Sequence, residues 1–280
     1  MFHAIRTAVL TPLAILLSFS AVNAQAIDPA KGTALFDALG LPEMIAIMRE
    51  EGLDYGEEIA TDLLSERANS AWDAKVSDIY NVDRMRTGVA AALDAALADA
   101  DVDAMLDFFT SEPGTEIIAL EVSARRALLD DAVDSAAKDS AAIALADETP
   151  RALMVQEFVT VNNLIDTNVT GAMNANFAFY TGLQDGGAFD RDLTEDQILT
   201  DVYNQEADIR RNTGEWVYAF LLLAYQPLSD DDLQAYITFS KTKPGQDLNT
   251  AMFTAFDQMF VAISRELGRA SAEYMAGQDI

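Results

Sequence analysis

Apolar residues in this chain recur every three or four positions, and this spacing constrains its fold more than any other feature. Val102, Met105, Leu106 and Phe109 are spaced as residues on one face of an α-helix. The same spacing runs through a later segment, at Phe253, Phe256, Phe260, Ile263 and Leu267. The alternation with period two that is typical of strands is hard to find. We therefore expect an all-α fold, a multi-helix bundle.

One helical pattern occurs twice, in segments 131 residues apart. Each copy has an acidic helix start, an amphipathic helix, a short corner and a longer helix. The corner reads Phe-x-x-(Ser/Thr)-x-Pro-Gly, and its residues are Phe108, Ser111, Pro113 and Gly114 in the first copy and Phe239, Thr242, Pro244 and Gly245 in the second. The sequence therefore predicts two tandem copies of a small helical module, at 25–147 and 151–280, packed together as one body.

Each residue of the corner has a structural explanation. Ser111 or Thr242 can cap the helix that follows, and proline fits the first turn of that helix because its missing N–H has no partner there. Glycine permits close packing or an unusual backbone angle. The pattern predicts a tight turn between two helices, and we interpret it as a packing feature rather than a site of chemistry.

The first residues have the features of a secretory signal peptide. Arg6 precedes an apolar stretch from about Ala8 to Val22, and small residues at Val22 and Ala24 fit a signal peptidase. The alternative is an uncleaved membrane anchor, but this stretch contains Pro12 and is shorter than the ~20 residues that a spanning helix needs. We expect residues 1–24 to be removed after Ala24, and a periplasmic or secreted protein without a membrane-inserted segment.

The composition excludes several classes of chemistry. The chain has no cysteine, and its one histidine, His3, precedes the predicted cleavage site. The chain after that site therefore cannot form disulfides or use Ser-His-Asp or Cys-His catalysis. It also lacks the usual ligands of zinc, copper and non-haem iron. The composition still allows a calcium or magnesium site with oxygen ligands. It also allows acid–base catalysis by carboxylates, lysine or tyrosine. We predict no catalytic residue, no metal and no cofactor.

The charge is strongly one-sided. The sequence has 46 acidic against 18 basic residues, a net charge of −28. Such a surface repels nucleic acid and anionic membranes and favours cationic partners. We therefore expect no nucleic-acid partner.

The two corners resemble the signature of an exported bacterial family known as domain of unknown function 2059. The resemblance covers about 40 residues in each copy and includes the acidic helix starts at Asp99–Asp103 and Asp230–Asp232. The chain departs from the family pattern at Phe109, where many members have Tyr, and at the equivalent position of the second copy, which is Ser240. The resemblance implies an all-helical exported protein, and it brings no activity and no catalytic residues.

Two charged clusters are candidate sites. Asp99, Asp101 and Asp103 superficially resemble a calcium loop, but Ala104 and Thr110 stand where that loop needs Gly and Glu, so we interpret the acids as a helix start. Glu121 and Arg125 could line a pocket or form a partly buried pair, four residues apart, on one long helix. We favour the pair.

A segment with few charges is the main candidate for ligand binding. Residues 158–184 contain one charged residue, Asp166, and five asparagines beside aromatic residues. These amides could meet a neutral polar ligand or make hydrogen bonds between buried helices, and we favour the second interpretation. The helix from Trp216 to Tyr225 is apolar on nearly every face and should be buried. The residues of a possible ligand site or interface are Asn174, Asn176, Tyr180 and Trp216.

Three functions fit these observations. The first is a non-enzymatic interaction or accessory protein of the cell envelope, with an envelope protein or a second copy as partner. The second is a binding protein for a small neutral ligand, held between the two modules. The third is a carboxylate-dependent hydrolase of cell-wall glycan, which would need a deep cleft around a buried glutamate.

Overall fold

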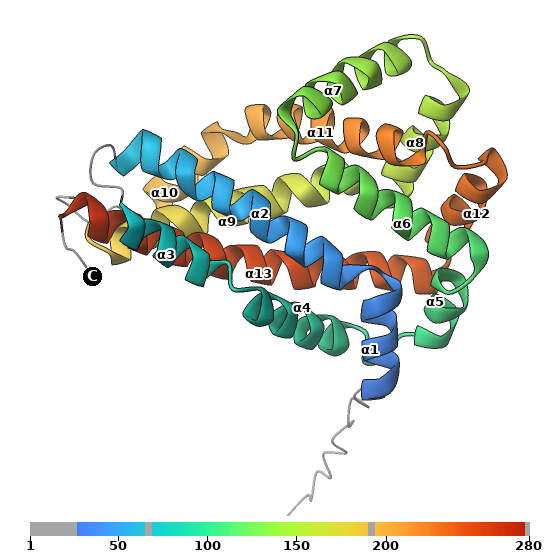
Figure 1. Ribbon diagram of the computed structural model, residues 1–280, viewed down its shortest axis with the longest axis horizontal. Helices are drawn as coiled ribbons and strands as arrows, with labels where there is room; N and C mark the ends of the chain where they lie inside the picture. The colour runs from blue at the N-terminus through green and yellow to red at the C-terminus, as the bar shows by residue number, and fades with distance from the viewer. Residues whose placement is uncertain (1–26, 65–68, 190–193, 278–280) are drawn as a thin grey trace, which may run out of the picture.

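A computed structural model describes residues 27–64, 69–189 and 194–277. These residues form helices joined by short turns, with no strand among them, which confirms the predicted all-α fold (Figure 1). No helix in the described ranges is long and apolar enough to cross a membrane. The predicted signal peptide and its cleavage site, Ala24, lie outside the described residues.

The helices follow one another closely along the chain. The first five and a short π-helix are α1 (Pro29–Ala38), α2 (Leu41–Ile59), η1 (Ala60–Leu64), α3 (Ser70–Ile79), α4 (Val82–Ala96) and α5 (Val102–Phe109). The next three are α6 (Glu112–Ala127), α7 (Asp131–Ala146) and α8 (Pro150–Val161). The last five are α9 (Leu164–Asp185), α10 (Glu195–Asn204), α11 (Glu206–Tyr225), α12 (Asp230–Ser240) and α13 (Lys243–Met275).

Most helix starts are fixed by a local side chain, which explains why the boundaries are sharp. The cap residue accepts a hydrogen bond from the first turn, so it satisfies an N–H that has no partner within the helix. Asp28, Asn69, Asn81, Asp101, Ser111, Asp130, Thr149, Thr194, Ser229 and Thr242 act in this way. Thr194 and Gln197 form a full capping box at the start of α10.

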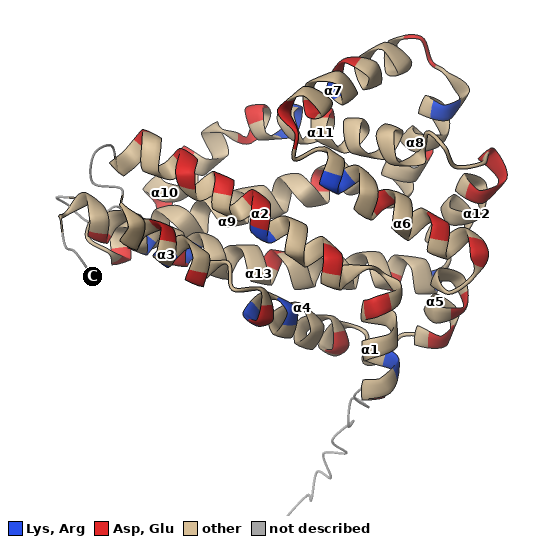
Figure 2. Ribbon diagram, in the orientation of Figure 1, with Lys and Arg blue, Asp and Glu red and all other residues tan. Residues whose placement is uncertain are grey.

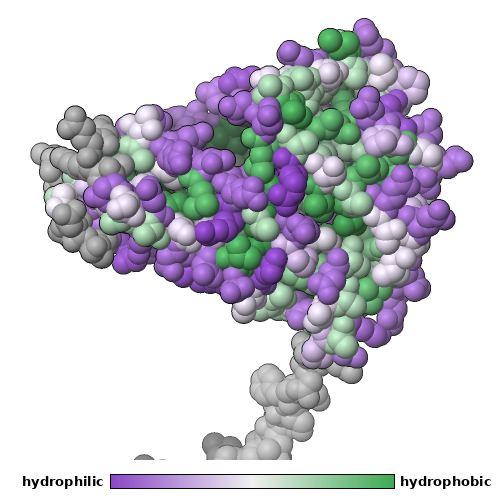
Figure 3. Space-filling view, viewed as in Figure 1, coloured by the Kyte–Doolittle hydropathy of each residue, from purple (hydrophilic) through white to green (hydrophobic). Residues whose placement is uncertain are grey.

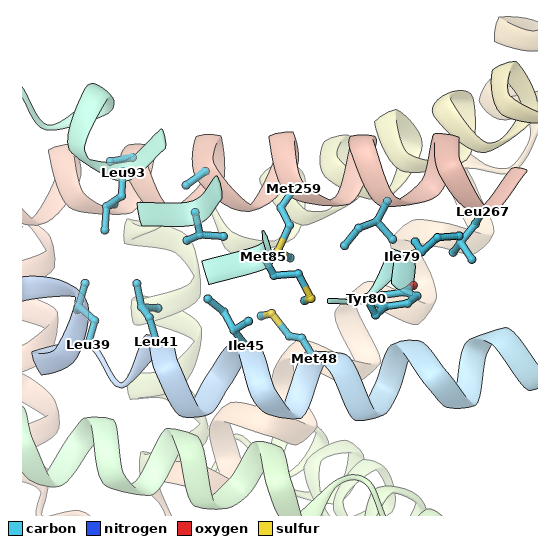
Figure 4. Close-up of a cluster of buried hydrophobic side chains, with 14 of the residues drawn as sticks. Leu39, Leu41, Ile45, Met48, Ile79, Tyr80, Met85, Leu93, Met259 and Leu267 are labelled. Atoms are coloured by element: carbon cyan, nitrogen blue, oxygen red, sulfur yellow. The ribbon is translucent and has the colours of Figure 1, made fainter. Parts of the chain in front are cut away.

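The longest helix, α13, crosses the middle of the molecule (Figure 1). It packs against α9 along one side and against α4 and α3 along another. The larger core lies between α13, α2, α3 and α4, and Figure 4 shows Ile45 and Met48 of α2 pointing toward Met259 of α13. Because this core joins residues before position 110 to residues after position 247, the two predicted modules share buried contacts.

A second core lies on the other side of the fold. It joins α6, α8, α11 and α12, and its most buried members include Ile117, Val155, Tyr225 and Leu233. Helix α7 packs separately on α11, through Ala137, Ala141 and Ala219. Figure 1 shows α7 above α11, at the edge of the molecule.

The segment 158–184 is not one helix, because Asn163 has a left-handed backbone with φ of 50° and separates α8 from α9. Helix α9 continues through Gly182 to Asp185. Gly182 packs α9 closely against α13 and does not break the helix.

Candidate functional site at the junction of α2, α6, α11 and α12

The two predicted corners have the same local geometry. The Ser111 hydroxyl accepts a hydrogen bond from the Gly114 N–H at 3.3 Å, and Thr242 accepts one from Gly245 at 3.2 Å. Both glycines lie against a carbonyl oxygen of the preceding helix, where a side chain would collide with it: Phe108 for Gly114 and Phe239 for Gly245. Pro113 and Pro244 stand in the first turns of α6 and α13. Capping and close packing therefore explain the motif at both places.

The corners meet through their phenylalanines. The rings of Phe108 and Phe239 are stacked with centroids 4.3 Å apart and an angle of 8° between their planes. Phe109 meets both rings edge-on, and Tyr236 stacks on Phe108 at 5.7 Å. This aromatic cluster joins α5 to α12 and brings the end of the first corner beside Tyr236.

A carboxyl group lies next to this cluster. Glu121 of α6 accepts a hydrogen bond of 2.6 Å from the hydroxyl of Tyr225, which is fully buried in α11. Tyr236 and Phe158 pack around Tyr225, so apolar rings replace water there. A buried hydroxyl and a partly buried carboxyl in apolar helices satisfy each other in this pair.

The apolar surroundings of Glu121 change the pKa of its carboxyl group. Burial raises the pKa of Glu121 to about 7, and the hydrogen bond from Tyr225 opposes the shift in part. Burial and the nearby Glu121 charge also raise the pKa of Tyr225 and of Tyr236 well above the ordinary tyrosine range. Glu121 is therefore a group that can gain or lose a proton near neutral pH.

Arg125 lies one turn after Glu121, but it does not pair with Glu121 as the sequence predicts. Its guanidinium donates to both carboxylate oxygens of Glu51 in α2, from Nε at 2.8 Å and from Nη2 at 2.6 Å. It also lies over the ring of Trp216 in α11, 5.0 Å from the centroid, and Phe220 stacks on that ring. The expected pair between Glu121 and Arg125 is thus replaced by two separate contacts, because each side chain finds a partner on another helix.

These contacts connect three helices. Arg125 links α6 to α2 by an ion pair and to α11 by its position over Trp216. Figure 3 shows apolar atoms gathered in a shaded hollow between α2 and α11, the two helices that Arg125 connects. The side chain of Tyr55 in α2 is 44% exposed. Its partial burial raises the pKa of its hydroxyl, and the charges of Glu58 and Tyr180 raise this pKa further.

The four residues predicted for a ligand site or interface have different partners. Asn174 donates to Asp257 of α13 at 3.0 Å, and Asn176 donates to Gln205 at 3.3 Å. The Asn174 contact is exposed and the Asn176 contact is part-buried, so only the second approaches the favoured interpretation of hydrogen bonds between buried helices. Trp216 supports Arg125, and Tyr180 lies near Tyr55.

The acidic helix start of the first copy also has structural partners. Asp101 caps α5 by accepting from the Ala104 N–H at 3.1 Å, and Asp103 pairs with Lys31 at 2.6 Å. No group of three or more acidic or histidine side chains in the described ranges is arranged to hold a metal ion. The helix-start interpretation accounts for both acids.

Sequence reasoning missed three residues of this site: Glu51, Tyr225 and Tyr236. A signal for Tyr225 existed, because a tyrosine hydroxyl in an apolar helix needs a buried partner and Glu121 is a polar group in another apolar segment. Nothing in the sequence pattern points to Glu51, which is one of several acids along α2.

Together, the fold and the site define an all-helical protein whose two corners pack against each other beside a buried carboxyl–tyrosine pair. Residues 83–142, from α4 into α7, match the model of a family described as "Uncharacterized protein conserved in bacteria (DUF2059)". The predicted family resemblance is therefore confirmed for this segment, which includes Phe108, Glu121 and Arg125. The second copy lies outside the match and stays a prediction. No curated protein and no solved structure matches the chain.

Proposed function

We propose that this chain is a non-enzymatic accessory protein of the bacterial cell envelope, exported after cleavage at Ala24, that acts by binding a cationic partner. The observation that carries this proposal is the distribution of charge over the folded chain. The matched family, which is conserved in bacteria, supports a bacterial setting, and the signal-peptide features of residues 1–24 support export.

The charge argument rests on where the basic side chains are used. In the described part of the chain, most arginines and lysines form ion pairs with acids of the same chain: Lys31, Arg84, Arg125, Arg126, Lys138, Arg151, Arg210, Arg211, Lys241, Lys243, Arg265 and Arg269. Arg49 and Arg86 instead donate to backbone carbonyl oxygens. Acids exceed bases by 28 in the sequence, so many carboxylates lack a cation of their own, and Figure 2 shows Asp and Glu spread over most helices. Such a surface attracts a basic protein or peptide.

The contacts of the candidate site support a structural role for its charges. Arg125 is occupied by Glu51 and Trp216, and Glu121 by Tyr225. Glycoside hydrolysis uses two carboxyl groups, whereas the partner of Glu121 is a tyrosine hydroxyl. Two cavities along α13, of about 610 and 280 Å³, do not include Glu121. The small-ligand alternative uses Asn174, Asn176, Tyr180 and Trp216, and the amides of both asparagines donate to side chains outside α9.

Export is tested by cell fractionation and by the mass of the isolated protein. We expect the wild-type chain in the periplasmic or secreted fraction with Gln25 as its first residue. The matched control is Ala24→Leu, which places a bulky residue where the peptidase needs a small one and should leave the uncleaved form. Wild-type protein that keeps residues 1–24 in the cytoplasm would contradict export.

Partner binding is tested by crosslinking in intact cells, followed by capture of the tagged protein and mass spectrometry. The captured partner should be basic, and the purified pair should bind more weakly as ionic strength rises, because salt screens the attraction. Capture of the protein alone, or of a partner whose affinity does not change with salt concentration, would contradict the proposal.

A further inference from the structure

One face of α2 combines acids with an exposed aromatic ring. The face is formed by residues at the i, i+3, i+4 and i+7 spacing of a helix: Glu51, Asp54, Tyr55 and Glu58. Glu51 is paired with Arg125. Asp54 and Glu58 are exposed, and neither is paired with a basic side chain of the described ranges. This face of α2 therefore presents two uncompensated carboxylates beside the ring of Tyr55.

The same face of α2 is directed toward α11. Arg125 pairs with Glu51 and also lies over the ring of Trp216, so this contact connects the acidic face of α2 to α11. Tyr55 lies one turn of α2 beyond this contact. The face of α11 that carries Trp216 is uncharged, with Ile209, Thr213, Trp216 and Phe220 at helical spacing.

A hollow lies between these two helices. Figure 3 shows it between α2 and α11, with apolar residues inside and hydrophilic residues along its edges. The contact of Glu51, Arg125 and Trp216 bridges the two helices at this place. The two sides of the hollow thus differ in chemistry, because α2 contributes carboxylates and α11 contributes uncharged side chains.

We propose that this hollow binds an amphipathic helix of a basic partner protein. The apolar face of that helix lies against α11, and its lysine or arginine side chains meet Asp54 and Glu58 of α2. An amphipathic helix that lays its apolar face into an apolar groove is a common form of peptide recognition. Complementary charge along the edge selects a basic helix over an acidic one. The inference rests on the proposed function, and it adds the surface and the shape of the partner segment.

Model peptides test the chemistry of this partner. The probe is a synthetic amphipathic helix with leucine on one face, lysine on the other and no tryptophan. Its binding to the purified mature protein is measured by calorimetry and by tryptophan fluorescence. The chain has two tryptophans, of which Trp72 is buried in the larger core and Trp216 lies at the hollow. We expect the Leu/Lys peptide to bind and to change the fluorescence, and Trp216→Phe should remove that change.

Two further peptides separate the apolar and the charged parts of the recognition. A Leu/Glu peptide of the same pattern should not bind, because its charge is repelled by α2. A Ser/Lys peptide should bind about tenfold more weakly than the Leu/Lys peptide, since its apolar burial is lost. The proposal is overturned if the Ser/Lys peptide binds as tightly as the Leu/Lys peptide, or if the Leu/Lys peptide binds without changing the fluorescence.

Paired variants locate the binding surface. Asp54→Asn with Glu58→Gln should weaken binding of the Leu/Lys peptide about fivefold, because two exposed ion pairs are lost. The matched control is Asp99→Asn with Glu116→Gln, which makes the same change in net charge at exposed acids before α5 and in α6. It should weaken binding less than about twofold, through net charge alone. Circular dichroism verifies that each variant is folded. Equal affinities of the two double variants would overturn the proposal.

The partner captured by crosslinking separates this inference from the proposed function. A basic partner that binds the wild type and the Asp54→Asn, Glu58→Gln variant equally well would support the proposed function and reject the hollow as its surface. Capture of no partner, with specific binding of the Leu/Lys peptide at the hollow, would contradict the proposed function and support the hollow as a surface for basic helices.

Discussion

The ring of Phe108 lies flat on the ring of Phe239, and these two residues hold the same position in the two copies of the corner motif. The corner motif therefore has two roles, since it turns the chain and it joins α5 to α12.

A double-mutant cycle tests this contact. Phe108→Leu and Phe239→Leu should each destabilise the fold, and the double variant should lose less than the sum of the two by about 0.5–1.5 kcal/mol, the value of an aromatic pair beyond its buried area. Urea unfolding followed by circular dichroism gives the free energies. The control cycle pairs Phe108→Leu with Phe179→Leu, since Phe179 packs beside Gly268 near the other end of α13. Those two changes should add within about 0.5 kcal/mol. Additive effects of the Phe108 and Phe239 changes would show that the stacking contributes no stability.

The raised pKa of Glu121 gives the fold a pH-dependent stability. A carboxyl with a pKa of about 7 in the folded state and 4.5 unfolded binds more protons when folded, so the free energy of unfolding falls as pH rises from 4.5 through 7. The expected loss is about 3 kcal/mol between these limits. Glu121→Gln removes the titrating group, so this part of the pH dependence should disappear and the variant should be the more stable protein at pH 8.

The measurement is the free energy of unfolding at intervals from pH 5 to pH 8. The matched control is Glu116→Gln, an exposed glutamate on the same helix, which should keep the wild-type dependence. If the Glu121→Gln variant shows the same slope as the wild type, the Glu121 carboxyl is not the group that links stability to pH.

Arg125 and its neighbour Arg126 provide a second matched comparison. Arg125 is held by two hydrogen bonds to Glu51 and lies over Trp216, whereas Arg126 is half-exposed and pairs more loosely with Glu43 and Glu50. Lysine keeps the charge but cannot form the two-point contact. Arg125→Lys should therefore cost about 1–2 kcal/mol and change the fluorescence of Trp216, while Arg126→Lys should cost less than about 0.5 kcal/mol. Equal losses for the two substitutions would contradict the role assigned to Arg125.

The features that could be predicted from the sequence are local ones. They are the helical periodicity, the caps at Ser111 and Thr242, and the proline and glycine of each corner. Each of them depends on residues within a few positions of one another. Such interactions form wherever the helix forms, so spacing alone reveals them. The family resemblance also rests on one of these local motifs.

The features that could not be predicted depend on which helices become neighbours. Glu51 is 74 residues from Arg125 along the chain, and Tyr225 is 104 residues from Glu121. A local pair between Glu121 and Arg125 looked favourable because residues four apart share a helix face. It does not form, because partners on α2 and α11 offer a two-point ion pair and a buried hydroxyl.

Helices α9 and α13 approach so closely that glycine is required on both. A methyl group on Gly268 would collide with the carbonyl oxygen of Phe179, and one on Gly182 would collide with that of Arg265. Gly268→Ala should therefore push the two helices apart and destabilise the fold by about 1–3 kcal/mol, the usual cost of overpacking.

The same substitution at Gly214 should have the opposite effect. Gly214 lies inside α11 with open space around it, so alanine there adds helix propensity without a collision. We expect Gly214→Ala to stabilise the fold by about 0.5–1 kcal/mol, since glycine costs this much relative to alanine within a helix. Thermal and urea unfolding of the two variants measure both effects in the same protein. Because the chemical change is identical, opposite signs can arise only from the surroundings of the two glycines, and a stabilising Gly268→Ala would disprove the close packing of α9 on α13.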